Sequence, residues 1–430
     1  MRRGVAERSS GTDEPDGEGR LTKEDESQHA SGTRSRPSLH SPPVNQSGRG
    51  TVLFITHSGD RVGPPIILLD LLRWISANTD VRFETLLWHG GELEAEFVEL
   101  APVHDVDRIR DWPVTVALEG LGAPGRRLSG WLRDARLRAW MWRIPRLRTV
   151  VVVSVGPNDY LRHVRPRRPR VITLALELGL QLVHLDDNGG RLRHETDRFV
   201  AGVDVVRDAL VEFGIAPERI AMAREFTNTT PPPPGPDIDR AALGIPDDAV
   251  VVGSAGVMEW RKAPELFVQV ALAAHAQAPD LALHFVWIGG DDQGYAARLA
   301  DEVARAGLAG RVHFPGRQSN PWDWFRMFDL FVLTSREDAF PLVCLENASV
   351  GNPIVCFDTG GMPEFVGDDE CGAVAPFPDV EAMARRVIEL AADHPERRRR
   401  GELGSIRVRE VYDVSVCAPL WYDAMESLLP

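Results

Sequence analysis

The sequence predicts an α/β protein with two parallel-sheet domains in series, preceded by a disordered extension. Two stretches of the chain repeat one order of elements, an apolar strand, a glycine-containing loop and a helix, first from Thr51 and again from Ala249. A proline run at 231–234 lies between them, and such a run forms an extended linker rather than a packed element. Residues 1–49 contain no Phe, Trp or Tyr, so they cannot bury enough apolar surface to offset the entropy of ordering.

The first domain is expected over residues 50–228. Its first strand is Thr51–Thr56, and a loop rich in glycine and proline then leads into a helix rich in leucine and isoleucine. Further strands are expected at Phe83–Leu87, Thr149–Ser154, Val171–Leu174, Phe199–Gly202 and Ile220–Ala223. Helical patterns separate several of these strands, and this alternation is typical of a parallel sheet.

The second domain is expected over residues 249–410, after a linker at 229–248. Its strands are predicted at Ala249–Ser254, Leu283–Ile288, Val312–Phe314, Leu330–Thr334 and Ile354–Phe357, with helices at 264–277 and 291–306. Residues 411–430 form a final helical segment, for which a return to the first domain is one option. Ligands of such folds bind at the carboxyl ends of the strands, so the cleft between the domains is the expected site.

The composition excludes several classes of protein. A formal net charge of −14 argues against a nucleic-acid binder, which usually presents a basic face. No apolar stretch reaches the ~18–20 residues of a membrane-spanning helix. No apolar segment follows Arg2 and Arg3 as a signal peptide requires, so a cytoplasmic location is expected. The four cysteines form no CxxC pair and are expected to be buried, reduced thiols.

The first strand of the second domain leads into a glycine turn that suits a phosphate. Gly256 ends this turn, Arg261 and Lys262 follow, and a helix begins at Pro264. Backbone N–H groups at a glycine turn and the positive potential of a helix N-terminus both attract anions. Lys262 is also the only lysine after residue 23, and a compact ammonium suits a phosphate. The alternative is an ordinary solvated basic pair.

A second cluster follows the fourth strand of this domain. Glu337 and Asp338 lie in a tight loop, and Glu346 is eight residues beyond Asp338 on the helix that follows. This spacing can direct carboxylates from the loop and the helix towards one cleft, where they would accept hydrogen bonds from sugar and ribose hydroxyls. The backbone N–H groups near Phe340 and Leu342 could hold a phosphate. The alternative is an acidic helix N-terminus that the helix dipole stabilises, with Glu346 on the surface.

Two further loops close strands of the same domain. Gly360 and Gly361 form an adjacent pair, which permits positive φ angles and close approach of the backbone. Gly316 and Arg317 follow the third strand and could frame a base. Each of these loops alone also fits a plain turn. Four such loops in one order within one domain, each closing a strand, indicate a ligand site.

In combination these loops resemble the donor-binding half of glycosyltransferase family 4, whose GT-B architecture has two Rossmann-like domains facing across a cleft. The resembling residues are Arg240–Pro246, the lysine loop, Val312–Gly316, the acidic loop with its helix, and Gly360–Glu364. The resemblance implies transfer with retention of anomeric configuration from a nucleotide sugar of the UDP or GDP type. It implies no bound metal or other cofactor. The acceptor, which could be a glycan, a lipid-linked intermediate or a small natural product, stays open.

The resemblance also implies roles by position. Lys262 matches the lysine on the donor diphosphate, Asp338 the carboxylate on the transferred sugar, and Glu346 the carboxylate on the ribose. Gly316 and Arg317 match the loop that frames the base. The leaving phosphate would assist deprotonation of the acceptor, so the transfer would need no protein nucleophile. Electrostatic stabilisation of the leaving diphosphate would then carry the catalysis.

Two positions of the second domain depart from the family pattern. Asp338 stands in place of a glutamate, and Glu337 just before it could hold the sugar instead. Val257 follows Gly256 where the family often has arginine, and Arg261 is an option for supplying that charge. These departures leave two alternatives open. One is a catalytically silent protein that binds a nucleotide sugar, and the other is a nucleotide-sugar epimerase of the same architecture.

The first domain resembles the acceptor-binding half of the family less closely. Gly63 lies in a glycine loop before the first helix, and Glu177 follows the strand predicted at 171–174. Before this glutamate the family has histidine, and here the position is Leu176. His57, at the end of the first strand, is a candidate general acid or base, or else a structural histidine.

One segment of the first domain is basic, whereas the chain as a whole is acidic. Between Arg126 and Arg148 lie further arginines and three tryptophans, with Asp134 as the only acid. A basic, tryptophan-rich amphipathic helix is typical of proteins that lie on a membrane surface. Contact with the inner face of a membrane is therefore one option. The alternative is that the tryptophans pack on the sheet and the arginines form a solvated face. The sequence indicates no oligomeric state.

Overall fold

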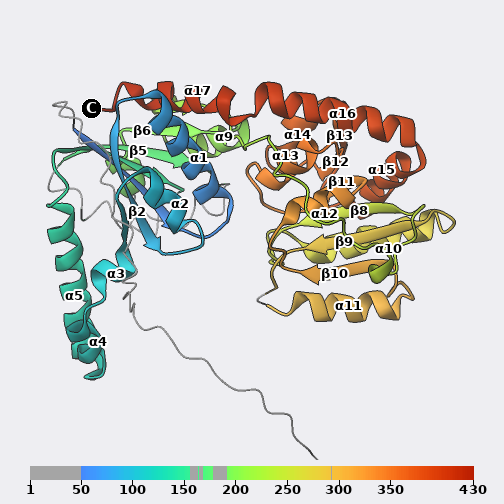
Figure 1. Cartoon of the computed structure of the whole chain (residues 1–430), viewed down its shortest axis with the longest axis horizontal. Helices are drawn as coiled ribbons and strands as arrows, with labels where there is room; N and C mark the ends of the chain where they lie inside the picture. Colours follow the sequence, from blue (N-terminus) through green and yellow to red (C-terminus); the bar gives the residue numbers. More distant parts are fainter. Residues whose placement is uncertain (1–49, 155–162, 164–167, 178–190, 292) are drawn as a thin grey trace, which may run out of the picture. The chain divides into compact units, whose positions relative to one another are not determined.

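The computed structural model describes residues 50–154, 163, 168–177, 191–291 and 293–430 (Figure 1). The segment predicted to be disordered, residues 1–49, lies outside the described residues. The described part of the chain contains two parallel sheets with helices between the strands, which confirms the predicted α/β class.

The first sheet has the strand order β3-β2-β1-β4-β5-β6-β7. Its strands are β1 (Thr51–Ser58), β2 (Arg82–His89), β3 (Val103–Asp105), β4 (Leu147–Val153), β5 (Arg170–Ala175), β6 (Arg198–Ala201) and β7 (Ile220–Met222). All pairings are parallel, and in the centre Phe54 lies opposite Thr85 on one side and Val151 on the other. The six predicted strands are confirmed. The edge strand β3 was not predicted, because its three residues contain no apolar run.

Helices connect these strands. They are α1 (Gly63–Asn78), α2 (Glu94–Leu100), α3 (Val106–Arg110), α4 (Pro113–Glu119), α5 (Gly122–Met141), α8 (Arg191–Glu195) and α9 (Asp204–Glu212). The first turn of α1 holds two prolines, which the helix tolerates because the N–H groups there have no intrahelical partner. Its buried residues, from Ile67 to Ile75, pack into the core of the first domain.

The second sheet has the strand order β10-β9-β8-β11-β12-β13. Its strands are β8 (Val250–Ala255), β9 (Leu283–Ile288), β10 (Val312–Gly316), β11 (Leu330–Leu333), β12 (Ile354–Phe357) and β13 (Gly372–Ala375). The chain adds strands outward from β8 and then returns to its other side at β11. The loops after β8 and β11 therefore leave the same edge of the sheet beside each other, and such a switch point is where ligands of doubly wound sheets bind.

The first helix of the second domain, α10 (Pro264–Gln277), has the predicted bounds. The others are α11 (Tyr295–Arg305), α12 (Pro321–Met327), α13 (Leu342–Ser349), α14 (Met362–Val366), α15 (Val380–Ala392), α16 (His394–Val411) and α17 (Val414–Glu426). The proline run before this domain contains no helix or strand, but it is held against α12. The N–H of Gly235 donates to the Asp323 carboxylate over 3.0 Å, and Arg326 donates to the carbonyl of Pro232.

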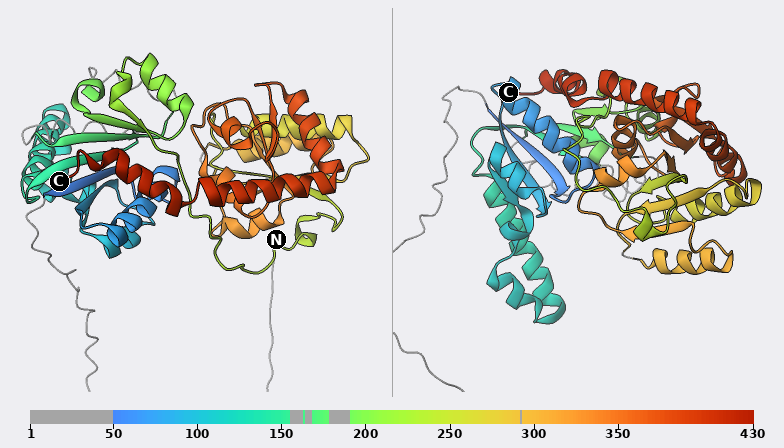
Figure 2. Two further views of the ribbon diagram at one scale, coloured as in Figure 1. Left: turned by 90° about the horizontal axis from the view of Figure 1, so that it is seen from above. Right: turned by 45° about the vertical axis from the view of Figure 1, so that its right-hand side comes forward.

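The chain crosses between the two domains twice, and the two crossings are bonded to each other. Thr227 and Asp413 form an isolated parallel bridge. Both the N–H and the hydroxyl of Thr229 donate to the Asp413 carboxylate, over 3.2 and 2.6 Å. The second crossing separates α16, which packs on α13, from α17, which packs on α1 (Figure 2).

The last helix is anchored in the first domain by its aromatic residues. Trp421 is completely buried, its ring meets Phe226 edge to face, and its Nε1 donates to the carbonyl of Arg224 over 2.6 Å. Tyr422 contacts the ring of Trp74 on α1. The chain therefore ends on the sheet with which it began.

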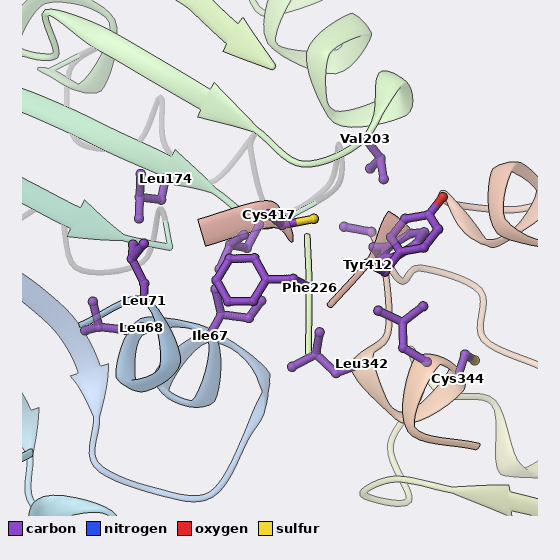
Figure 3. Packing of buried hydrophobic residues seen from close by; sticks show 14 of the residues in the cluster. Ile67, Leu68, Leu71, Leu174, Val203, Phe226, Leu342, Cys344, Tyr412 and Cys417 are labelled. Carbon is purple, nitrogen blue, oxygen red and sulfur yellow. The ribbon is translucent and has the colours of Figure 1, made fainter. Parts of the chain in front are cut away.

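A single hydrophobic cluster joins the two domains. It contains Ile67 of α1, Phe226 of the first crossing, and Leu342 and Cys344 of α13 (Figure 3). All four cysteines are buried and free, which confirms the expectation of reduced, packed thiols.

Candidate functional site

A cavity of about 850 Å³ lies at the carboxyl ends of both sheets. Its first-sheet side is formed by the start of α1 and by residues at the ends of β1, β4, β5 and β7, namely His57, Ser154, Glu177 and Glu225. Its second-sheet side comes from the loops after β8 and β11 and from α13. The cavity has the size of a small-molecule site and the position at which such folds bind ligands.

The cavity brings together most of the predicted site residues. Those that line it are His57, Gly63, Glu177, Gly256, Arg261, Lys262, Asp338, Phe340, Leu342 and Glu346. Those that do not line it are Gly316, Arg317, Glu337, Gly360 and Gly361. Asp338, rather than Glu337, is therefore the acidic-loop carboxylate that faces the cavity.

The backbone holds Lys262 at the N-terminus of α10. Gly256 has a φ of +147°, a conformation that favours glycine, and its N–H donates to the carbonyl of Ile288 over 2.9 Å. Ala263, just after the lysine, is buried and left-handed with a φ of +51°. Thr334 donates to its carbonyl over 3.1 Å. Non-glycine residues hold such a conformation only where the surroundings impose it, and such positions cluster at ligand sites.

Lys262 reaches across to the acidic loop. Its ammonium donates to the carboxylate of Asp338, which also accepts a hydrogen bond from the hydroxyl of Ser335 over 3.1 Å. The two loops are joined along their backbones as well, because the N–H of Arg336 donates to the carbonyl of Arg261 over 2.7 Å. A ligand anion would therefore meet an ammonium that is already oriented into the cavity.

Glu346 lies on α13 and faces the cavity from the second-sheet side. Its pKa is raised to about 7, mainly by burial and also by the negative charge of Asp70 on α1, whereas Arg61 acts in the opposite direction. The carboxyl group is thus partly protonated near neutral pH. It can both donate to and accept from a hydroxyl group of a ligand.

Gly360 and Gly361 pack against the backbone of the acidic loop. A Cβ at Gly360 would lie 1.9 Å from the carbonyl oxygen of Asp338, and the N–H of Gly361 donates to the carbonyl of Ala339 over 2.7 Å. Only glycine allows this approach, so the pair positions the loop without lining the cavity. Phe340, which does line the cavity, stacks on Tyr412 at 5.2 Å between ring centres.

Arg317 lies outside the cavity that most of the other predicted site residues line. Its side chain is 68 % exposed and forms an ion pair with Glu92, between β2 and α2, over 2.6 Å. Gly316 ends β10 with a φ of +78° and forms a turn there.

His57 lies in β1 with its imidazole at the cavity. Burial lowers its pKa, an effect that His89 strengthens and Asp60 opposes. The ring is therefore neutral at neutral pH, and its buried Nδ1 has no hydrogen-bond partner among the described residues. A neutral imidazole at this position can accept a proton.

Ser154 and Glu177 join the ends of β4 and β5. The hydroxyl of Ser154 donates to the Glu177 carboxylate, whose other oxygen accepts from the N–H of Leu176 over 3.2 Å. Leu176, where the family has histidine, is buried and presents an apolar side chain to the cavity.

Four charged or polar residues of the lining were not predicted from the sequence: Arg61, Ser154, Glu225 and Glu259. Glu225 is the most unusual, because it is 3 % exposed and lies just beyond β7. An acidic residue two positions after a predicted strand was a usable signal, but it belongs to no motif.

Among the described residues, no group of three His, Cys, Asp or Glu side chains could hold a metal ion. No helix there combines the length and the hydropathy that crossing a bilayer requires.

Two Rossmann-like parallel sheets that end at one cavity define the GT-B class of fold. The solved structure of Anabaena HepE in complex with UDP-glucose has the same fold. It superposes with a TM-score of 0.71 and 18 % sequence identity over 88 % of this chain and 99 % of HepE.

Residues 236–405 match the family "Glycosyl transferases group 1". The chain is 28 % identical to D-inositol 3-phosphate glycosyltransferase of Thermobispora bispora over 86 % of this chain and 89 % of that protein. It is also 33 % identical to the lipopolysaccharide core biosynthesis mannosyltransferase LpsB of Rhizobium meliloti, over 36 % of this chain and 45 % of LpsB.

Proposed function

We propose that the protein is a retaining hexosyltransferase that uses a UDP- or GDP-sugar as its donor. The donor would occupy the second-sheet side of the cavity and the acceptor the first-sheet side. The observation that carries this proposal is the placement of Lys262 in the cavity, beside Arg261 and at the N-terminus of α10. Two cations and a helix dipole at one point favour a diphosphate.

The relatives support the same donor class. HepE was solved with UDP-glucose, and the relatives from Thermobispora bispora and Rhizobium meliloti carry the names of sugar transferases. The acidic loop fits the transferred sugar, because Asp338 is released to accept from a sugar hydroxyl once the diphosphate takes over Lys262.

Retention follows if the acceptor attacks from the face that the diphosphate leaves. The bond between the anomeric carbon and the phosphate oxygen breaks, and a bond from that carbon to the acceptor oxygen forms. The leaving phosphate takes the acceptor proton, while Lys262 and Arg261 stabilise the charge that develops on it. Neutral His57, on the first-sheet side, is the alternative base.

We expect one series of nucleotide sugars to raise the thermal unfolding midpoint of the full chain. A ligand present at about 100 times its Kd adds roughly 2.7 kcal/mol to the free energy of unfolding. The measurement is a thermal-shift panel of UDP-, GDP-, dTDP- and ADP-sugars, followed by NMR of the product formed with acceptor.

The NMR spectrum separates the alternatives. Retention requires an α-linked product from an α-linked donor, and an inverted product would contradict it. Conversion of the donor alone into an isomer would indicate an epimerase. Binding of the nucleotide sugar without turnover of any acceptor would favour the silent binding protein.

A further inference from the structure

Glu225 is a buried carboxyl group that lines the cavity and is 3 % exposed. Its Oε1 has no hydrogen-bond partner among the residues that the structure describes. Neither carboxyl oxygen forms an ion pair with a residue that the structure describes. An unsatisfied buried polar group destabilises a protein by about 1–3 kcal/mol, so its presence in a native cavity requires an explanation.

Neighbouring residues hold the side chain of Glu225 in place. A Cβ at Gly202, which follows β6, would lie 2.3 Å from the Cγ of Glu225, so the glycine leaves the space in which the glutamate lies. The preceding residue is fixed as well, because the carbonyl of Arg224 accepts the hydrogen bond from Trp421. The carboxyl group is therefore held at the end of β7 and at the wall of the cavity.

The surroundings of Glu225 are acidic. Burial raises its pKa well above the usual range, and the charges of Asp338 and Glu177 raise it further. The cations in the described lining each have another carboxylate: Lys262 pairs with Asp338, Arg261 with Glu259 and Arg61 with Glu96. The described lining therefore favours the neutral form of Glu225 and pairs no cation with it.

We propose that Glu225 binds the acceptor, and that the acceptor is a polyhydroxylated molecule with a protonated amine, such as an amino sugar or an aminocyclitol. This inference rests on the proposed function, because it assigns the first-sheet side of the cavity to the acceptor. An ammonium group offers three donors and a positive charge. It would give both oxygens of Glu225 a partner and would stabilise the ionised carboxylate beside Glu177.

The same arrangement disfavours a phosphorylated acceptor. A phosphate monoester would be placed beside Glu177 and Glu225, where its charge is repelled. A neutral hydroxyl would give one oxygen of Glu225 a partner but would bring no positive charge to it. The acceptor would thus differ in charge from the inositol phosphate that names several relatives of this chain.

The test compares methyl glycosides that differ at a single group. Binding of methyl 2-amino-2-deoxyglucoside, methyl glucoside and methyl glucoside 6-phosphate is measured by calorimetry, with the full chain saturated by UDP. We expect the amine to bind at least tenfold more tightly than the neutral sugar, and the phosphate not to bind. In Glu225→Gln the preference for the amine should disappear, while the affinity for UDP stays unchanged.

The control is Glu218→Gln, an exposed acid just before β7, which should keep the preference. The proposal is overturned if wild-type protein binds the amine no better than the neutral sugar, if it binds the phosphate best, or if it does not bind the amine. Retention of the preference in Glu225→Gln also overturns it. If UDP does not bind, the titration is repeated with GDP, and failure of both nucleotides to bind contradicts the proposed function instead.

A second and independent feature is the helical hairpin formed by α4 and α5, which projects from the first sheet (Figures 1 and 2). The two helices pack closely, since a Cβ at Gly125 would lie 1.9 Å from the carbonyl oxygen of Leu118. Towards the sheet α5 buries Leu137 and Met141. The sequence alternative, in which the tryptophans of this segment pack on the sheet, does not hold for Trp131, which is 62 % exposed.

An apolar stripe runs along the outer face of α5. Leu121, Leu128, Trp131 and Trp142 are each between 47 % and 69 % exposed, and their spacing of 7, 3 and 11 residues places them on one helix face. Exposed apolar groups that gather in this way mark an interaction surface.

Arginines flank this stripe. Arg126, Arg127, Arg138 and Arg143 are exposed, and none forms an ion pair with the residues that the structure describes. By contrast, Arg133 pairs with Asp111, which precedes α4, and with Glu119 at the end of α4. In a chain of net charge −14, this is a local concentration of uncompensated positive charge.

We infer that this face of α5 docks on an anionic lipid bilayer. The arginines complement the headgroup charge, and the tryptophans and leucines have the amphipathic character of residues at the membrane interface. The protein would bind as a peripheral protein and would bring its cavity to acceptors at the bilayer surface.

Co-sedimentation of the full chain with vesicles tests this inference. Binding is expected to vesicles that contain phosphatidylglycerol and not to pure phosphatidylcholine, and to weaken with salt. Each arginine replaced by glutamine at 126, 127 or 138 should lower the affinity about fivefold. Trp131→Ala should weaken it too, whereas Trp260→Ala, an exposed tryptophan of the second domain, should not. Equal binding to both vesicle types, no binding, or preferential binding of duplex DNA overturns the inference.

Discussion

Replacement of Lys262 by alanine is expected to lower kcat for transfer about 10²- to 10³-fold and to remove the thermal shift caused by the donor. The reason is that the ammonium lies at the point where the diphosphate would carry its developing charge, and removal of one such electrostatic contact has effects of this size. Lys262→Arg should restore little, because the guanidinium is planar and larger than the ammonium that Asp338 and the start of α10 accommodate.

Two controls test whether the loss of rate and of donor shift is specific to Lys262. Arg317→Ala removes an exposed arginine outside the cavity lining and should leave transfer nearly unchanged. Circular dichroism should show a folded protein for both variants. A Lys262→Ala protein that keeps the full donor shift and the full rate would refute the proposed position of the diphosphate.

Replacement of Trp421 by alanine is expected to destabilise the protein by about 3–5 kcal/mol, the usual result of deleting a large buried aromatic ring. The substitution creates a cavity between α17 and the first domain and leaves the carbonyl of Arg224 without its hydrogen-bond donor. Because Glu225 is the next residue, acceptor binding should weaken more than donor binding. Urea denaturation measures the free energy of unfolding, and calorimetry separates the two ligands.

Leu420→Ala is the matched control for this substitution. Leu420 is the neighbouring residue on α17 and is 42 % exposed, so its truncation should change the free energy of unfolding by less than about 1 kcal/mol. Equal destabilisation by both substitutions would show that α17 is not anchored through Trp421.

The elements that could be predicted from the sequence are those with a continuous apolar core. Strands such as Leu283–Ile288 and Ile354–Phe357 were predicted with their bounds, because they are buried on both faces. The strands that were missed, β3 and β13, have three and four residues and contain His, Asp, Gly or Ala. Their strand conformation comes from pairing with a longer neighbour, and no local pattern encodes it.

The candidate site also contains residues that could be predicted from the sequence and residues that could not. The lysine loop and the acidic loop were found because each follows a strand, and they meet because β8 and β11 are neighbours in the sheet. The partner of Arg317 was not predictable, because Glu92 is in the other domain. Glu225 was missed for a related reason. Its burial depends on Gly202 and Trp421, which are distant in the sequence and meet only in the fold.

The scarcity of lysine has a practical consequence for the cavity. Residues 50–430 contain one primary amine on a side chain, that of Lys262, and it lies beside Asp338. A reagent that selects amines will therefore report on a single position in this part of the protein. Reductive methylation with isotope-labelled formaldehyde would place one NMR probe on that nitrogen, and its chemical shift would follow the exchange of Asp338 for a ligand. Lys262 would thus serve as a spectroscopic probe of the cavity, and no residue would have to be introduced.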